Sequence, residues 1–448
     1  MITLGNVIER VNSTVNSFLW GPLMLIVFIG CGAYFSLKTS FLQLRCFPFI
    51  FKNLFSDIKQ NSKKEINSFK ALATALSGTM GVGNIIGVTA AIISGGPGAV
   101  FWMWASAFFG MMTKYAEATL AIVTRRSKNG ENYGGAMYYI EDGTGSRFVA
   151  VLFSVFCLLA SYGVGNMAQS NAAASIMNDV FKIPKPLIGT AVCIITAVVI
   201  FGGIKRISLI SSAVIPALSA VYILMSLTVI IANISSVPKV FSCILSDAFS
   251  FRAAKGGALG FLMSKSVRIG LARGVFTNEA GMGSASIAHA SGNESSPAKQ
   301  GAFGIFEVFL DTFVITTLTA LAALCSGAFS QSSSASGTEV AIKTFSSVFG
   351  KSGEIITAVS LLLFALPSIF GWAYYGEQSV IYIFGKKTGV RFLFKLSFSL
   401  AAVLGAVIGS SLVFEISDTF NGLMSIPNIV ALLILSPQVI SETNKLFK

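Results

Sequence analysis

Two glycine-rich segments with polar side chains interrupt long apolar stretches of this chain. The first break is Ser77–Asn84, with the sequence SGTMGVGN, and the second break is Asn278–Ser284, with the sequence NEAGMGS. Glycine weakens a helix, and a polar group inside a bilayer is costly unless it faces protein or a water-filled cavity. Unwound backbone at membrane depth is likewise tolerated only where it is buried in protein or lines a water-filled cavity. Two such interruptions in corresponding halves of a chain indicate a transporter binding site.

The first break supplies ligand types that suit a hard cation and a zwitterion. Unwinding a helix frees carbonyl groups for a cation, and the amides of the following half-helix can hold a carboxylate. Thr79 adds a hydroxyl and Asn84 an amide oxygen, both of which suit sodium. We assign Thr79, Gly81 and Gly83 to a substrate, and Thr79 and Asn84 to a cation. The alternative is close helix packing through small residues.

The second break carries a carboxylate. Glu279 costs roughly 2.5–3.5 kcal/mol at the bilayer centre without a partner, so it needs a counter-charge or a cavity. Arg268 and Arg273 are candidate partners, and direct contact with substrate or ion is the alternative. Around it we assign three residues of the same segment to the substrate. These are Thr277, Asn278 and Gly281.

Other polar residues in apolar spans extend the candidate site. Asn166 and Gln169 are three positions apart and share a helix face, where two amides suit an ammonium and a carboxylate. The alternative for this pair is hydrogen bonding between helices. Trp372 can form one wall of an apolar pocket for a small side chain.

Two further spans each contain a pair of charged residues at helical spacing. Asp311 shares a helix face with Glu307 and can complete a cation site or pair with a basic residue. Lys114 and Glu117, three positions apart, are expected to form a local ion pair.

Composition defines the class of protein. The chain of 448 residues is 54% hydrophobic and 11% charged, whereas soluble domains carry about 25% charged residues. We therefore expect an all-α polytopic membrane protein. The net charge of +13 comes largely from short loops, as orientation signals do, and no basic run alternates with aromatics as in a nucleic-acid surface.

About eleven apolar spans have the length that a bilayer requires. They are 18–37, 71–93, 98–123, 148–177, 187–204, 207–232, 258–290, 301–326, 353–375, 392–413 and 420–440. Lys and Arg concentrate in the loop 38–70 and in alternate loops after it, which places the N-terminus outside and the C-terminus in the cytoplasm.

The spans divide into an extra helix and two sets of five within a single membrane domain. Residues 1–70 form the extra N-terminal helix and a basic cytoplasmic loop, and residues 441–448 form a cytoplasmic tail. The sets 71–232 and 258–440 each open with a broken span. Because five is odd, the second set starts on the opposite side of the membrane, so two similar halves are inverted repeats.

Residue types also exclude some classes. One histidine and no paired-aspartate motif argue against an enzyme and against a transition-metal site, and no CxxC spacing occurs among the six cysteines. We expect no cofactor. An ion or solute channel is the alternative from another class, but it needs a filter sequence or a continuous polar stripe.

Several motifs resemble the alanine/glycine:cation symporter family, over nearly the whole chain. They are 95–104 (GGPGAVFWMW), 165–169 (GNMAQ), 270–284 (GLARGVFTNEAGMGS), 371–377 (GWAYYGE) and 418–428 (DTFNGLMSIPN). The resemblance implies a leucine-transporter-like fold and sodium-driven uptake of a small neutral amino acid, alanine or glycine, at the cytoplasmic membrane. A proton is the alternative coupling ion, and glutamine or another neutral amino acid is the alternative substrate.

The resemblance also implies two cation sites. Thr79 and Asn84 would serve an ion near the substrate. The carbonyls of Ser77 and Met80, with Ala365 and Ser368, would serve a second ion. Pro367 stands where the family usually has a small hydroxyl residue, beside this second site, and Ser286 stands where proline is frequent. We expect the protein to act as a monomer in the bilayer.

Overall fold

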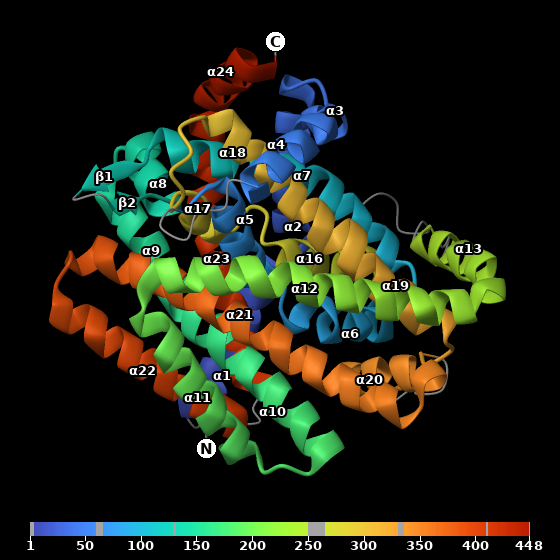
Figure 1. The fold of residues 1–448 in the computed structure, drawn as a ribbon. Coiled ribbons are helices and arrows are strands. Elements are labelled where there is room, and N and C mark those ends of the chain that lie inside the picture. The colour runs from blue at the N-terminus through green and yellow to red at the C-terminus, as the bar shows by residue number, and fades with distance from the viewer. Residues whose placement is uncertain are drawn as a thin grey trace.

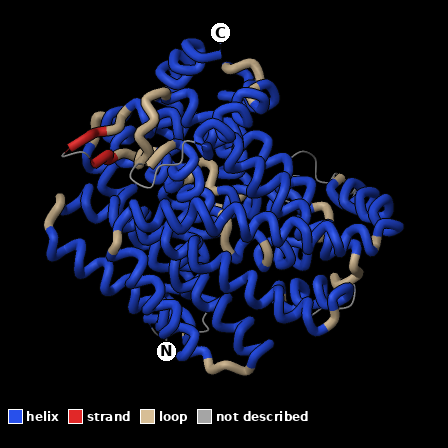
Figure 2. Tube along the Cα trace, viewed as in Figure 1, coloured by secondary structure: helices blue, strands red, loops and turns tan. Residues whose placement is uncertain are grey.

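Helices form nearly all of the described chain, and two short strands form a hairpin at its margin (Figure 1, Figure 2). The computed structural model describes residues 4–59, 66–128, 131–249, 265–329, 336–408 and 411–447. The ends marked N and C lie on opposite sides of the molecule (Figure 1). The start of the span predicted from residue 258 and most of the polar stretch 331–337 lie outside the described residues.

Long apolar helices occupy most of the predicted spans. They are α1 (Leu4–Leu19) with α2 (Pro22–Lys38), α5 (Ser68–Thr79) with α6 (Ile86–Gly95), α7 (Ala99–Val123), α9 (Arg147–Tyr162) with α10 (Ala168–Phe181), α11 (Lys185–Phe201), α12 (Gly203–Ala232), α16 (Lys265–Asn278) with α17 (Ser284–His289), α18 (Pro297–Val308) with α19 (Thr317–Cys325), α21 (Lys351–Phe384), α22 (Thr388–Val407) and α23 (Ser411–Ile434). By length and composition, six described helices can cross a membrane, or eight if each of two bent pairs is one span. The count of eleven stays a prediction.

Segments read as connections contain further short helices. α13 (Val237–Ala248) lies in the 233–257 connection and α20 (Gly337–Phe349) in the 326–352 connection. The polar, glycine-rich segment 130–145 contains strand β2 (Glu131–Tyr133), which pairs with β1 (Arg126–Lys128), and then the short helix α8 (Ala136–Thr144). The side chains of Met137, Tyr139 and Ile140 in α8 are buried in protein.

The C-terminal region differs from the predicted span 420–440. α23 ends at Ile434, and α24 (Ser436–Phe447) continues from it at an angle of 61°. α3 (Leu42–Arg45) leads into α4 (Phe47–Lys59), and α24 lies beside α4 (Figure 1), where the rings of Phe49 and Phe447 are 5.0 Å apart. The bend therefore divides the predicted span.

Local sequence signals fix where the helices around the breaks begin. Asn67 caps α5, because its Oδ1 accepts a hydrogen bond from Lys70 N at 3.0 Å. Ser296 caps α18, whose first residue is Pro297. α5 packs against α21 and α12 and also against α17, while α7 packs against α16, α17 and α18. The two breaks consequently lie close together between α7 and α21.

Candidate functional site

The first break joins α5 and α6, which meet at an angle of 62°. α5 ends at Thr79, and a single 3-10 turn, Val82–Asn84, precedes α6. Asn84 stabilises this turn, since its Oδ1 accepts a hydrogen bond from Gly81 N at 3.2 Å. Because the helix is interrupted here, backbone N–H and C=O groups that would bond within a continuous helix can bond to side chains or to a ligand.

Asn84 also contacts a carboxylate from a distant part of the chain. Its Nδ2 donates to Asp311 Oδ1 at 2.6 Å, and Asp311 Oδ2 accepts from Thr312 Oγ1 at 2.9 Å. Asp311 lies in a π-helical segment, Phe309–Thr316, between α18 and α19. Both Asn84 and Asp311 are buried. The structure thus brings together the two residues that we assigned to a cation from different spans.

Gln169 binds the freed backbone of the first break. Its Oε1 accepts a hydrogen bond from Val82 N at 3.1 Å, and its Nε2 donates to Val164 O at 3.3 Å. Val164 lies in a second π-helical segment, Gly163–Met167, which joins α9 to α10. Gln169 therefore holds an amide that could otherwise bind a substrate carboxylate.

A small buried cavity lies between the two breaks. It is lined by Gly78, Thr79, Gly81, Gly83, Val164, Gln169, Phe276, Thr277, Glu279 and Trp372. Its volume of about 20 Å³ accommodates about one water molecule. Six predicted substrate residues line it: Thr79, Gly81, Gly83, Gln169, Thr277 and Trp372.

Three other predicted substrate residues do not line this cavity. Asn166 Nδ2 donates to Phe398 O of α22 at 2.5 Å, so its amide joins two helices. Asn278 Nδ2 donates to Thr312 Oγ1 at 3.3 Å, and Gly281 N donates to a carboxylate of α7. In this structure their polar groups are used for packing and for shaping the second break.

Sequence reasoning missed Gly78, Val164 and Phe276 as lining residues, and left Glu279 undecided. Phe276 could have been found, because it directly precedes Thr277 in the same motif. Val164 offered no signal, since an aliphatic residue in a membrane helix has the same sequence pattern in packing and in a pocket wall.

The residues predicted for the second cation lie where the first break meets α21. Ser368 Oγ donates to Gly78 O at 3.3 Å, whereas Ser77 Oγ donates to Thr74 O within α5 at 2.7 Å. Met80 and Ala365 are fully buried. Pro367 is accommodated inside the continuous helix α21. The hydroxyl of Ser368 therefore points at the break despite the neighbouring proline.

A carboxylate from α7 organises the second break. Glu117 Oε1 accepts hydrogen bonds from Gly281 N and Gly283 N, both at 2.9 Å, and from Asn428 Nδ2 at 2.7 Å. Asn428 of α23 in turn accepts a hydrogen bond from the hydroxyl of Tyr139 in α8. The break is thereby tied to three other elements through one carboxylate oxygen.

The expected ion pair between Lys114 and Glu117 is wrong. Lys114 does not pair with Glu117 but with Glu307 of α18, at 3.4 Å between Nζ and Oε1. The reason is that Glu117 is turned toward the amides of the second break. Glu279 accepts a hydrogen bond from Ser284 Oγ at 2.5 Å, while the guanidinium of Arg273 stacks on the Phe276 ring at 5.3 Å.

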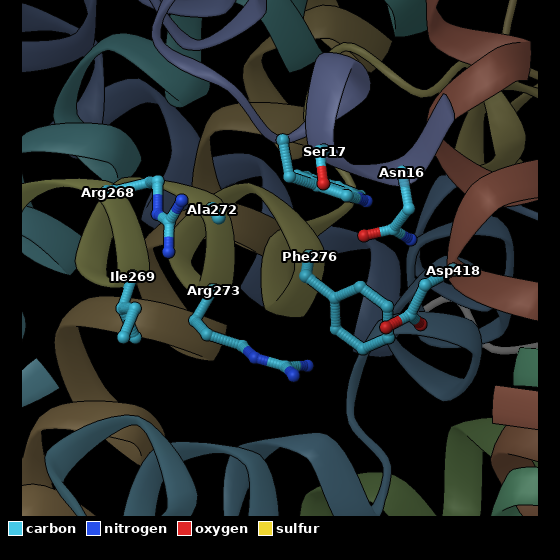
Figure 3. A pocket seen from close by; sticks show the side chains of 9 residues that line it. Asn16, Ser17, Arg268, Ile269, Ala272, Arg273, Phe276 and Asp418 are labelled. Carbon is cyan, nitrogen blue, oxygen red and sulfur yellow. The ribbon is translucent and has the colours of Figure 1, made fainter. Parts of the chain in front are cut away.

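Two larger cavities approach the small one from one side. Their volumes are about 310 and 330 Å³, and they share Arg273, Phe276 and Asp418. Figure 3 shows the first of them, with Arg273 and Asp418 reaching toward it and the Phe276 ring beside them. The second also shares Gly83 and Val164 with the small cavity. Phe276 therefore borders all three spaces.

A separate cavity of about 450 Å³ lies near the C-terminal end of α21. Its wall includes Tyr374, Glu377 and Arg391. Glu377 Oε1 pairs with Arg391 Nη2 at 2.7 Å and with Lys395 Nζ at 3.1 Å. Trp372 of the small cavity and Tyr374 of this larger one are two positions apart in α21.

Comparison with known proteins shows the family of the chain. The model of the sodium:alanine symporter family matches residues 5–448. The chain is 41% identical to the sodium/alanine symporter AgcS of Methanococcus maripaludis (96% of this chain, 95% of that protein). It is 34% identical to the probable sodium/glutamine symporter GlnT of Bacillus subtilis (97% and 89%).

The fold has a solved counterpart at low sequence identity. The structure of MhsT in complex with L-phenylalanine aligns with a TM-score of 0.60 at 14% identity, covering 85% of this chain and 99% of that one. This similarity shows a leucine-transporter-like fold. The relatives named by function are transporters, symporters and carriers rather than enzymes. The chain is a multi-pass membrane protein that belongs to the sodium:alanine symporter family.

Proposed function

We propose that this protein takes up a small neutral amino acid, alanine or glycine, together with sodium by alternating access. The observation that carries the proposal is the small cavity between the two breaks, with the Asn84–Asp311 contact beside its lining. The cavity has hydroxyl, amide and backbone groups for a zwitterion. Asp311 supplies a buried negative charge that a sodium ion would balance.

The walls of the cavity favour a short side chain. Trp372 and Phe276 close it, and the Trp372 ring packs on Tyr375 at 5.4 Å between centroids. Behind Trp372 stands Gly165, where an added Cβ would lie 2.3 Å from Trp372 Cβ. Trp372 therefore has no space to retreat on that side. Since the cavity accommodates about one water in this structure, its walls must separate to admit any amino acid, and the small side chains of alanine and glycine require the least separation.

Sodium has two proposed sites, and no other cofactor is proposed. Thr79, Asn84 and Asp311 would hold the ion next to the substrate. The Ser77 and Met80 carbonyls, with Ala365 and Ser368, would hold a second ion between the first break and α21. Ser368 already contacts the break through Gly78 O, which supports the second placement.

We further propose an N-terminus outside and a C-terminus inside the cytoplasmic membrane, for a protein acting as a monomer. In this arrangement the segments 71–232 and 258–440 are inverted repeats. The support is that each contains a helix pair interrupted by glycines, α5/α6 in one and α16/α17 in the other. Labelling of single cysteines introduced at Lys182 and Lys387 from outside intact cells tests the orientation: only the first should react.

The decisive experiment is uptake into proteoliposomes. Labelled alanine or glycine should accumulate when sodium is higher outside, and should not accumulate without the gradient. Competition with unlabelled amino acids then ranks alanine and glycine against glutamine. Accumulation that ignores the sodium gradient, or no uptake of any neutral amino acid, contradicts the proposal. Stronger competition by glutamine than by alanine contradicts the assigned substrate.

A further inference from the structure

A cluster of charged side chains lies inside the helical core beside the second break. It contains Lys114 and Glu117 of α7, Glu279 of the second break, His289 of α17 and Glu307 of α18, each 3% exposed or less. Uptake of an amino acid with sodium does not by itself require these groups. Their charge balance therefore needs its own explanation.

Lys114 and His289 both serve Glu307. Lys114 Nζ lies 3.4 Å from Glu307 Oε1, and His289 Nε2 lies 2.8 Å from Oε2. Gln300 Nε2 donates to His289 Nδ1 at 2.7 Å. Because the amide nitrogen of Gln300 donates, Nδ1 accepts, and the ring donates from Nε2 to Glu307. The one positive charge of Lys114 thus balances one carboxylate.

Two acids remain, and their surroundings differ. Within the described residues, neither Glu117 nor Glu279 has an ion-pair partner of its own, and two uncompensated buried charges cost several kcal/mol each. Glu117 accepts three N–H hydrogen bonds through Oε1, which favour its ionised form. Glu279 has a hydrogen bond with the Ser284 hydroxyl. A hydroxyl can also accept, so this contact is compatible with a protonated Glu279.

Glu279 also has access to a route for a proton. It lines the small cavity, which accommodates about one water. The hydroxyl of Tyr375 is fully buried, and the described residues give it no hydrogen-bond partner. It lies 2.6 Å from where a Cβ on Gly78 would be, and Gly78 lines the same cavity. An unpartnered hydroxyl and space for water therefore stand beside the acid.

We propose that Glu279 binds a proton from the cavity between the two breaks, at a site separate from the cation site of Asn84 and Asp311. A hydronium ion in the cavity gives its proton to the Glu279 carboxylate and leaves as water. The groups that face Glu279 are Lys114 and Glu117 of α7, Glu307 of α18, Cys157 of α9 and Tyr375 of α21. The binding of the proton stands alone, whereas its part in transport rests on the proposed symport.

Infrared spectroscopy of the purified protein in lipid tests the site directly. At neutral pH the wild type should show the C=O absorption of protonated carboxyl groups. Glu279→Gln should lose one carboxyl's share of it, whereas Glu117→Gln should keep it. Glu377→Gln, which removes a carboxylate paired with Arg391, is the control if Glu117→Gln does not fold. An unchanged absorption in Glu279→Gln overturns the proposal, as does its loss in either control.

Transport provides the second readout. In proteoliposomes with a fixed sodium gradient, alanine uptake by the wild type should change with pH, by up to about tenfold per unit away from the midpoint of a one-proton site. For Glu279→Gln the ratio of uptake at acidic and alkaline pH should be near one, whatever its absolute rate. A ratio equal to that of the wild type overturns the role in transport. If the wild type shows no sodium-driven uptake, the proposed function fails, and the infrared result still decides the proton site.

Discussion

The two breaks share glycines and polar residues, but they are held by different kinds of group. Neutral amides of Asn84 and Gln169 hold the first break. A carboxylate, Glu117, holds the second. Their backbones differ as well. Gly81 in the first break has a φ of −126°, which any residue adopts, whereas the second break has left-handed backbone at Glu279 (φ 53°), Gly281 (93°) and Gly283 (83°).

This difference separates two tasks. The first break is held by the amide side chains of Asn84 and Gln169, whose hydrogen bonds can be exchanged for bonds to an ion or a zwitterion. The second break is fixed by charge-assisted hydrogen bonds and by backbone conformations that favour glycine. We therefore expect substitutions of Asn84 and Gln169 to act mainly on transport, and substitutions of the groups that anchor the second break, such as Glu117, to act mainly on stability.

The largest effect is expected from Glu117→Ala. It leaves two backbone N–H groups and the Asn428 amide without their acceptor in the core, at a cost of about 3–5 kcal/mol for breaking a buried charged network. Thermal unfolding of the purified protein measures it. Glu442→Ala, which removes a pair with Lys445 on an exposed helix face, should cost less than about 1 kcal/mol. Equal losses for the two variants would contradict the anchoring role of Glu117.

A matched pair of glycine substitutions compares the breaks directly. Gly283→Ala places a Cβ in left-handed backbone, 2.8 Å from Ala136 Cβ and 2.9 Å from Asn428 Oδ1, and should cost about 1–3 kcal/mol. At Gly83 in the first break, an added Cβ has no neighbour within 4 Å, so Gly83→Ala should unfold like the wild type. If Gly83→Ala is less stable than Gly283→Ala, the proposed difference between the two breaks is wrong.

Within the first break, ion and substrate effects should separate. Asn84→Ala removes the partner of Asp311 and should raise the sodium concentration for half-maximal uptake about tenfold, since one such hydrogen bond contributes about 1.5 kcal/mol. Gln169→Ala should raise the KM for alanine by a similar factor and shift the sodium dependence less. Uptake kinetics at varied sodium and alanine measure both. Wild-type kinetics in both variants would show that the site lies elsewhere.

The smallest effect concerns a loop next to the second break. Burial raises the pKa of Glu294, but hydrogen bonds from Lys299, Ser296 and Ser68 and the charge of Lys299 outweigh it, so the net pKa lies below its ordinary value of 4.5. A lowered folded-state pKa stabilises the fold above the ordinary pKa and loses this contribution as the pH falls through the folded value.

Glu294→Gln should therefore lower stability at neutral pH by less than about 1 kcal/mol, because its ion pair with Lys299 is partly exposed to solvent. The difference from the wild type should shrink as the pH falls below 4.5. Thermal unfolding at several pH values measures it. A difference that grows on acidification would show that Glu294 is not stabilised in its ionised form.

The sequence predicted the breaks better than it predicted their partners. Glycines among polar residues in apolar spans are a local signal, and both breaks occur where this signal places them. The contact of Asn84 with Asp311 joins residues 227 positions apart, so residue types suggested a shared role but could not show that they meet. For Asn166 the sequence left two alternatives open, because an amide has the same sequence signal whether it faces a cavity or a carbonyl of α22, which it contacts in this structure.

Long-range contacts also explain what the sequence could not predict. Helical spacing favoured Lys114 with Glu117, but the amides of the second break compete for Glu117 and Glu307 for Lys114. The polar, glycine-rich composition of 130–145 carries no signal of burial. It did not show that Tyr139 is buried to donate to Asn428. In both cases the deciding partner is distant in sequence, where spacing rules carry no information.

The hydrogen bonds from Tyr139 through Asn428 and Glu117 to the second break have a mechanical consequence. They connect α8, α23, α7 and the backbone that leads into α17. Since separating any of these elements exposes a buried carboxylate or amide, the four are expected to move as one rigid body. Relative motion is then left to boundaries made of neutral and apolar contacts, such as the one where Ser368 of α21 meets Gly78. During transport, the helices should therefore move relative to one another at the boundary beside the first break, while the second break moves as part of one rigid body.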